Sequence, residues 1–491
     1  MIEFSFIPLF TWLVSLLAVP AILLCRKKPD VREGVTFLAA FLKLGMVFMM
    51  LPLIRDGKIL HFRFGEILPG IPIEFRVDGL GMLFALVASS LWILTTLYSV
   101  GYMRGLKEHD QTRFFAYFAI SLSATIGVAF AGNLLTLYIF YEILSLSTYP
   151  LVIHHGDKEA RTGGRTYLSH LLGTSVAFVL PAMIYCYWKS GTDINFTEGA
   201  FLDGKIGSSD GLIVLLAFTL GFAKSGLMPF HSWLPNAMVA PTPVSALLHA
   251  VAVVKVGVFC VLRIFTGVFD ADFLQKLNVG TVITYIAAFT IIVSSLIALT
   301  QDNLKRRLAF STIGQLAYIV LGVSFLSSNG VTGSVMHIAM HAFGKITLFF
   351  CAGAIFVASG KKYISQMVGL GKQMPITMIA FLIGSLSIIG LPPFGGAWSK
   401  WYLFLGALDA NQTAMVIVLV ISSLLNIAYL LPIPVNALFR SPPQKDGKGS
   451  DAGIKEAPLA CLIPLCITAL AGLLFFLFPG LGFELAQLIT K

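Results

Sequence analysis

Three titratable side chains recur at every fourth position of one apolar segment. They are His337, His341 and Lys345. On an α-helix this spacing places them in one stripe that rises about 6 Å per step. Because imidazole titrates near neutral pH and exchanges protons at both nitrogens, such a stripe can relay protons. A metal site would need a third ligand beside the two histidines, and we expect none. Two core histidines bonded to helix backbone are the other alternative.

Five further ionisable residues lie inside long apolar segments: Glu142, Lys224, His249, Lys255 and Lys400. Burial disfavours the ammonium form of lysine, whereas a nearby carboxylate favours it. A Glu142–Lys224 pair whose separation changes would therefore hold or release a proton. The alternative is a static ion pair that fixes helix packing. Because Lys400 follows a proline break, unpaired carbonyls of the broken helix can stabilise its charge.

Three other polar residues have plainer interpretations. Lys43 lies midway along an early apolar segment, where it could reach the membrane surface or pair with a neighbouring subunit. Its role is left open. His154 and His155 stand beside the charged stretch 157–159, and we expect both to be solvated.

The composition indicates where these residues must be placed. Of the 491 residues, 57% are hydrophobic and 12% are charged, whereas soluble domains typically carry about 25% charge. The mean hydropathy is +0.86. A soluble globular protein is therefore excluded, and an all-α polytopic membrane protein is expected. The net charge of +10 is scattered between apolar runs, which argues against nucleic-acid binding.

Fourteen membrane spans of about 20 residues are expected. They lie near 4–24, 35–54, 77–102, 114–131, 133–152, 166–188, 211–229, 243–265, 278–300, 306–326, 331–358, 375–410 with a break, 413–438 and 457–478. If the spans alternate from an outside N-terminus, the inside loops carry about twice as many Lys and Arg as the outside loops. The positive-inside rule therefore predicts a multi-pass protein of the inner (plasma) membrane with both termini outside.

The cysteines give no sign of a cofactor. The six occur singly, with no CxxC pair. That pattern does not favour an iron–sulfur cluster, a zinc site or a disulfide framework. We expect no cofactor and no metal.

An internal repeat accompanies two proline breaks. Gly-Leu-Met-Pro-Phe at 226–230 resembles Gly-Leu-Pro-Pro-Phe at 390–394, and a tryptophan follows each. The helix-breaking residues are Pro229, Pro392 and Pro393. By the predicted topology the two broken spans run in opposite directions, which is typical of inverted-repeat transporters. The alternative is chance, because proline is common in membrane helices.

Longer motifs occur in order along the chain. They are the segment around Glu142, residues 223–237, 240–249 and 301–312, the column formed by His337, His341 and Lys345, and residues 390–400. In this order they resemble the antiporter-like membrane subunits shared by respiratory complex I, Mrp-type multisubunit cation/proton antiporters and membrane-bound energy-converting hydrogenases. The resemblance covers nearly the whole chain, which looks like the shorter D-type antiporter subunits or the middle subunits of complex I. The span of His249 and Lys255 looks more like that of the larger family members, and Lys400 stands where one complex I subgroup has glutamate.

The resemblance implies a fourteen-helix fold with two inverted five-helix repeats, in spans four to eight and nine to thirteen. It divides the chain into a three-helix region (1–113), a first repeat (114–270), a second repeat (271–438) and a linker with the last span (439–491). Each repeat would hold a proton half-channel around its broken helix.

The resemblance also implies roles for the buried residues. Glu142 and Lys224 would form the switching pair of the first half. Lys255 or His249 would pass the proton toward the centre, the histidine–lysine column would carry it onward, and Lys400 would be the terminal site.

The leading expectation is a proton-translocating subunit of a cation/proton antiporter-type complex, with Na⁺ exchange as an option. It would assemble with homologous antiporter-like subunits and small hydrophobic subunits. The first rival is the same machine inside complex I or a membrane-bound hydrogenase, where peripheral redox subunits do the chemistry. A stand-alone organic-solute transporter would need a polar substrate pocket instead of titratable lines. A membrane enzyme is disfavoured because no nucleophile–base pair is evident.

Overall fold

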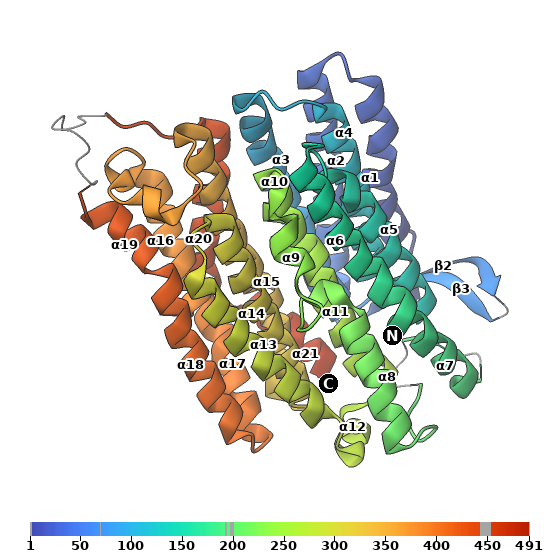
Figure 1. Ribbon diagram of the computed structural model, residues 1–491. Helices are drawn as coiled ribbons and strands as arrows, with labels where there is room; N and C mark the ends of the chain where they lie inside the picture. The colour runs from blue at the N-terminus through green and yellow to red at the C-terminus, as the bar shows by residue number, and fades with distance from the viewer. Residues whose placement is uncertain (1, 69, 192–193, 197–200, 442–452, 491) are drawn as a thin grey trace.

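Long apolar helices standing side by side form the body of the molecule (Figure 1). The computed structural model describes residues 2–68, 70–191, 194–196, 201–441 and 453–490. In that part of the chain, 11 helices are long and apolar enough to cross a membrane. The polytopic helical fold is confirmed, whereas the count of fourteen spans stays a prediction.

The N-terminal helices form the edge of the bundle that carries the blue to green ribbon (Figure 1). They are α1 (Ile7–Leu24), α2 (Pro29–Arg55), α3 (Gly79–Gly105), α4 (Gln111–Ala129), α5 (Leu134–Val152), α6 (Lys158–Thr174), the π-helical η1 (Ser175–Val179), α7 (Leu180–Ser190) and α8 (Ser208–Gly221). Side-chain caps start several of them. The Asp78 carboxylate, for example, accepts from the Gly81 N–H at 2.9 Å at the start of α3, as N-caps do.

The predicted span 211–229 is broken well before its proline. α8 ends at Gly221, and the short η2 (Ala223–Ser225) follows. Gly226 then takes a left-handed conformation with φ of +72°, and Pro229 lies in the non-helical stretch beyond it. Since glycine adopts positive φ at little cost, Gly226 turns the chain before Pro229 prevents the helix from resuming.

Short and π-helical segments, with one longer α-helix, lie within and on either side of the next predicted span, 243–265. They are α9 (Trp233–Asn236), η3 (Ala237–Val239), α10 (Thr242–Val244), the π-helical η4 (Ser245–Ala252), α11 (Val253–Arg263), the π-helical η5 (Ile264–Val268) and α12 (Ala271–Leu277). Every residue of α11 is buried. This helix therefore lies inside the protein.

The second half contains the longest helix and the second break. Its elements are α13 (Gly280–Thr300), α14 (Leu304–Ser324), α15 (Ser328–Ser359), η6 (Ile364–Met367), η7 (Leu370–Lys372), α16 (Pro375–Ile389), α17 (Gly396–Asp409), α18 (Thr413–Leu430), α19 (Pro432–Phe439), α20 (Leu459–Leu477) and α21 (Gly480–Thr490). Between α16 and α17, Gly390 has φ of +85°, and Pro392 and Pro393 lie in the turn that follows.

A small sheet, which the all-α prediction did not include, stands at the end of the bundle near the start of the chain (Figure 1). β1 (Ile2–Phe4) pairs in parallel with β2 (Ile59–Leu68), which pairs antiparallel with β3 (Ile71–Val77). β2 and β3 lie between the predicted spans 35–54 and 77–102, and apolar and polar residues alternate there too briefly to predict strands.

Candidate functional site

A direct hydrogen bond joins a lysine of α11 to a histidine of α15. Lys255 Nζ lies 2.5 Å from His341 Nδ1, and both side chains are at most 1% exposed. The other ring nitrogen of His341 has no hydrogen-bond partner among the described residues. Either residue can therefore hold the proton shared in this hydrogen bond. The Nε2 atom of His341 remains available for another hydrogen bond.

His337 stands one turn before His341 on α15. The two ring centroids are 5.6 Å apart and the rings are nearly parallel. His337 Nδ1 lies 2.8 Å from the Ser399 hydroxyl and Nε2 lies 3.2 Å from Gln315 Oε1. Side chains, not helix backbone, therefore hold this imidazole. Since serine both donates and accepts, Ser399 can bond to His337 in its neutral or its protonated form.

Lys345 completes the column and reaches α14. Its Nζ donates to the Ser311 hydroxyl at 2.6 Å and to the Leu308 carbonyl at 3.4 Å. Tyr429 also donates to Ser311, at 2.8 Å. His337, His341 and Lys345 thus share one buried helix, and His337 and Lys345 both contact α14, through Gln315 and Ser311 respectively.

Lys400 is bound at the second break. Its Nζ donates to the carbonyl of Ile389, the last residue of α16, at 2.7 Å, and to Ser423 at 3.2 Å. The final carbonyls of a helix have no partner within it and carry partial negative charge. Gly390 leaves room for this approach, because a Cβ there would come within 2.6 Å of Lys400 Cδ.

Lys224 is bound at the first break, on η2. Its Nζ donates to the Tyr141 carbonyl at 2.8 Å and to the Ser145 hydroxyl at 2.6 Å, both on α5. The same nitrogen lies 3.0 Å from the centroid of the Tyr141 ring. Lys224 is fully buried, so neutral oxygens and an aromatic face replace water around it.

Glu142 lies on α5 between the two residues that bind Lys224. Both carboxylate oxygens are buried, and neither has a hydrogen-bond partner among the described residues. Nor does Glu142 form an ion pair there with Lys224. Glu142 therefore lies next to the residues of α5 that bind Lys224, but its carboxylate is not bonded to the Lys224 ammonium.

Lys224, Lys345 and Lys400 share one pattern of contacts: each ammonium donates to one serine hydroxyl and one backbone carbonyl. We name this the serine–carbonyl pattern. Sequence reasoning singled out the lysines but missed the hydroxyls, since serine is frequent in membrane helices. His249 belongs to η4, and its side chain lies outside the part of the chain that the structure describes.

A polar cavity of about 540 Å³ opens where the two halves meet. Its lining includes Ala240 and Thr242 from the segment before η4 and Lys305 from α14. The Lys305 ammonium donates to the Ala240 carbonyl at 2.6 Å. Residues of both halves therefore close this cavity, beside the start of the segment that leads to Lys255.

Glu108 and His155 stand at the rim of the same cavity. His155 Nε2 lies 3.4 Å from Glu108 Oε1. This hydrogen bond raises the pKa of His155 above its ordinary value and lowers the pKa of Glu108. His154, expected to be solvated, is buried instead, and burial lowers its pKa to about 4. It packs flat on the His109 ring at 4.7 Å.

Two family models match the chain. The model described as "NADH:quinone oxidoreductase/Mrp antiporter, TM" matches residues 131–426, more than half of the sequence. The model "NADH-Ubiquinone oxidoreductase (complex I), chain 5 N-terminus" matches residues 69–115. The chain belongs to the NADH:quinone oxidoreductase/Mrp antiporter family.

Curated relatives agree with this family. NADH-quinone oxidoreductase subunit N of Desulforudis audaxviator is 34% identical over 487 residues, which cover 96% of this chain and 94% of that protein. NAD(P)H-quinone oxidoreductase chain 5 of Synechocystis is 34% identical over 360 residues, 70% of this chain. The match spans 51% of the Synechocystis protein, so this antiporter-like chain corresponds to about half of that longer relative.

Solved structures share the fold. A chain of the Mrp complex from Dietzia superposes with a TM-score of 0.86 at 23% identity, covering 99% of this chain and 96% of that chain. A chain of the membrane-bound sulfane sulfur reductase, an archaeal respiratory membrane complex, gives 0.88 at 24% identity, covering 99% and 98%. The antiporter-like fold therefore extends over the whole chain.

Proposed function

We propose that this antiporter-like chain translocates protons through buried lysines and histidines, as a subunit of a cation/proton antiporter-type complex. The observation that carries the proposal is the 2.5 Å hydrogen bond between Lys255 and His341. It joins the two halves of the chain by two groups that exchange protons, at a point where no described carboxylate is bonded to either one. A static ion pair would not use two basic partners.

The central step is a proton transfer along this hydrogen bond. The Lys255 ammonium gives its proton to His341 Nδ1, and the free Nε2 of the resulting imidazolium gives one onward. The His341 and His337 ring centroids lie 5.6 Å apart, and His337 Nε2 already donates to Gln315. The next transfer therefore needs a bridging water, which gives a proton to the Ser399 hydroxyl as that hydroxyl gives its own to His337 Nδ1. Ser399 then turns its hydroxyl as His337 changes protonation state, since it contacts Nδ1 in either state.

The first half supplies the switch in this proposal. Lys224 is held by the Tyr141 carbonyl and the Ser145 hydroxyl, with the Glu142 carboxylate unpartnered beside them among the described residues. A shift of η2 along α5 that brings Lys224 to Glu142 would favour the ammonium form, and the return would favour proton release. In the second half, Lys400 of α17, which donates to the last carbonyl of α16, would be the terminal site.

The proposed topology and repeats rest on the arrangement of the helices. In Figure 1, α8 (green) and α16 (orange) enter from opposite ends of the bundle, and each ends at a glycine-containing break. This supports inverted units at 114–270 and 271–438, with 1–113 and 439–491 outside them. We assign the chain to the inner (plasma) membrane with both termini outside. The loops at the end of the bundle away from the termini carry the excess of Lys and Arg, and such loops lie inside by the positive-inside rule.

The alternative is a proton pump inside a redox complex, where other subunits carry the redox centres. The nearly full-length match to NADH-quinone oxidoreductase subunit N favours it, while the Mrp complex shares the same fold. Both versions place other membrane subunits beside this chain. Mass spectrometry of the complex purified gently from native membranes decides between them. Small hydrophobic antiporter subunits alone support the antiporter, and flavin or iron–sulfur subunits support the redox complex.

Transport by the purified complex in proteoliposomes tests proton translocation. Lys255→Met removes the central proton carrier while preserving its volume, and we expect transport to fall by about a hundredfold. Lys158→Met, which alters an exposed lysine, is the matched control and should transport normally. Full transport by an assembled Lys255→Met complex would refute the proposed route.

A further inference from the structure

Lys43 is completely buried on α2, away from both helix breaks. It is 0% exposed. Its Nζ donates to the Ser15 hydroxyl of α1 at 2.6 Å and to the Leu122 carbonyl of α4 at 3.4 Å. The sequence left two options open, an ammonium at the membrane surface or a contact with a neighbouring subunit. The burial excludes both, so this lysine needs another explanation.

The contacts of Lys43 repeat the serine–carbonyl pattern of Lys224, Lys345 and Lys400. One serine hydroxyl and one backbone carbonyl accept from the nitrogen. An aromatic ring lies beside it as well, with the Trp92 ring at 5.1 Å, as Tyr318 lies beside Lys400 at 5.1 Å. A lysine outside both proposed repeats therefore has the same surroundings as the transport lysines within them.

No described charged group faces Lys43. The elements packed around it present a hydroxyl from α1, a carbonyl from α4 and an indole from α3. The indole Nε1 of Trp92 is itself buried without a hydrogen-bond partner in the described structure. A buried ammonium without a counter-ion is costly, so this site favours a lysine that exchanges its proton over one that stays charged.

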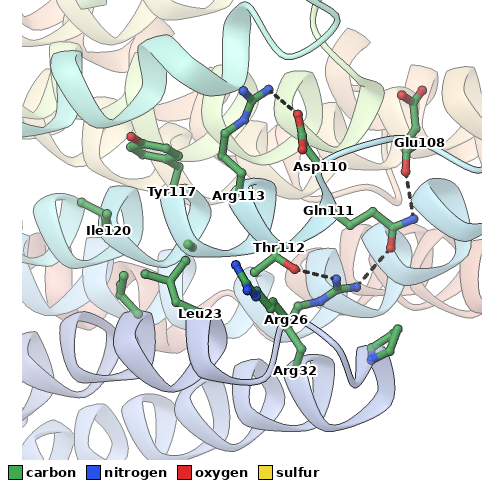
Figure 2. A pocket seen from close by; sticks show the side chains of 13 residues that line it. Leu23, Arg26, Arg32, Glu108, Asp110, Gln111, Thr112, Arg113, Tyr117 and Ile120 are labelled. Atoms are coloured by element: carbon green, nitrogen blue, oxygen red, sulfur yellow. Dashed lines mark hydrogen bonds and ion pairs between the residues drawn. The ribbon is translucent and has the colours of Figure 1, made fainter.

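An open cleft of about 800 Å³ lies between α1, α2 and α4, the three helices that carry Ser15, Lys43 and Leu122 (Figure 2). Figure 2 shows Arg26, Arg32 and Arg113 around it, together with Glu108 and Asp110. These are the charged groups that line it.

The inner lining of the cleft approaches the Lys43 contacts. Val19 lines the cleft on α1, one helical turn from Ser15. Ile120 lines it on α4, and Leu122 follows about 3 Å further along the helix axis, on another side of α4. Val19 is therefore the lining residue that shares a helix face with a group that binds Lys43.

A hydroxyl contact joins the helix that binds Lys43 to the helix that binds Lys224. Ser121 of α4 lies next to Leu122 in sequence, and its hydroxyl is 3.2 Å from that of Ser147 on α5. α5 also carries Ser145, which binds Lys224. The two helices that bind the two lysines therefore share a pair of exchangeable hydroxyls.

We propose that Lys43 is an additional proton-binding site, loaded through the cleft between α1, α2 and α4 and connected to the first half through the α4–α5 hydroxyls. The amine takes a proton from water in the cleft and becomes an ammonium, and the same proton leaves to the next acceptor. No other reactant is consumed. This inference rests on the proposed proton translocation but concerns a site outside both repeats.

Two substitutions separate proton exchange from a structural charge. Lys43→Met cannot bind a proton, and Lys43→Arg keeps the charge but does not release it. In proteoliposomes containing the whole complex, we expect both to lower proton transport by about tenfold or more and to flatten its pH profile. A structural cation would be restored by arginine. Normal transport by either assembled variant overturns the inference.

A parallel variant separates this inference from the proposed function. Lys224→Met should abolish transport whatever Lys43 does. If Lys224→Met transports fully, the proposed route itself fails. If it is inactive while Lys43→Met is fully active, only the additional site fails.

Cysteine labelling tests the cleft even if Lys43 variants do not assemble. In a background where Cys25 and Cys466, the two cysteines that are not buried, are replaced by serine, Val19→Cys and Ile120→Cys should react with a small hydrophilic thiol reagent, because the cleft holds water. Leu17→Cys is the control: Leu17 is 63% exposed on α1, and the cysteine there should react only with a lipophilic maleimide. If the cleft cysteines behave like Leu17→Cys, lipid or a partner helix fills the cleft and the inference is overturned.

Discussion

In the described part of the chain, neutral oxygens and not carboxylates accept the hydrogen bonds of the buried Lys43, Lys224, Lys345 and Lys400. A carboxylate partner accepts hydrogen bonds and fixes the ammonium form, whereas a serine hydroxyl accepts from an ammonium and donates to an amine. The serine–carbonyl pattern at Lys224, Lys345 and Lys400 therefore keeps both protonation states hydrogen-bonded. This property suits residues that must hold a proton for part of a cycle and lose it in another part.

Adding a carboxylate to one of these sites should trap its proton. In the variant Ser145→Asp, the new carboxylate takes the place of a hydroxyl 2.6 Å from Lys224 Nζ. For each tenfold increase in the proton affinity of Lys224, the pH at which the lysine releases its proton rises by about one unit. We expect slower transport at neutral pH, with its maximum moved to higher pH. Ser145→Ala is the control, since it removes the hydroxyl without adding charge. A Ser145→Asp profile that coincides with the Ser145→Ala profile contradicts this prediction.

The Glu108–His155 contact at the cavity rim should depend on pH. The pKa of His155 is raised and that of Glu108 is lowered. The contact therefore stabilises the fold above the lowered pKa of Glu108 and below the raised pKa of His155, and its contribution is lost as pH rises through the latter. Partly exposed pairs contribute at most about 1 kcal/mol. Hydrogen exchange of residues 153–157, corrected for its intrinsic pH dependence, should be faster at pH 9 than at pH 6. His155→Gln should abolish the difference.

At the scale of elements, the two helix breaks each place a lysine ammonium next to a backbone carbonyl. Lys400 donates to the last carbonyl of α16, and Lys224 donates to a carbonyl of the neighbouring α5. Proline predicted both breaks, yet the helices end earlier, at Gly221 and Ile389. Gly226 and Gly390 then turn the chain in the left-handed region. The breaks were predictable because proline removes a backbone donor. The residue at which each helix ends was not predictable, because it depends on packing against other helices.

The approach of α11 to η2 gives a prediction about an element. A Cβ at Gly257 would overlap the backbone of Lys224 and Ser225. Gly257→Ala should therefore displace η2, lower the melting temperature of the complex by an amount equivalent to about 1–3 kcal/mol, and reduce proton transport.

A second glycine provides the matched control. A Cβ added at Gly45 on α2 would have no heavy atom within 4 Å, and alanine there should be neutral or stabilising by up to about 1 kcal/mol through helix propensity. Equal melting temperatures for Gly257→Ala and Gly45→Ala complexes would show that η2 tolerates displacement.

At the scale of the whole molecule, the site depends on contacts between distant segments. The apolar pattern was sufficient to identify Lys255 and His341 as buried ionisable residues, because an uninterrupted hydrophobic segment implies burial. It gave no sign that they touch, since 86 positions separate them. The same holds for His337 and Ser399, 62 positions apart. Periodicity describes one helix at a time, whereas packing between helices decides which titratable groups become neighbours.

The arrangement of the whole bundle predicts which residues face each side of the membrane. The chain labels N and C stand at the same end in Figure 1. Since α1 leads away from that end and α2 returns to it, Lys27 and Asp56 must lie at opposite ends. Both are exposed. In the proposed topology, the basic residues around Lys27 assign that end to the inside.

Labelling of intact cells with a membrane-impermeant maleimide checks this orientation, in a background where the two cysteines that are not buried, Cys25 and Cys466, are replaced by serine. Asp56→Cys should react in intact cells, and Lys27→Cys only after permeabilisation. The reverse pattern would mean that the bundle is inserted the other way round. Glu108, at the cavity rim, follows α3, which also leads away from the N-terminal end. The cavity and the cleft between α1, α2 and α4 therefore open at the same end as Lys27. With the reverse labelling pattern, both would open at the outside surface. Protons would then enter both from the opposite compartment.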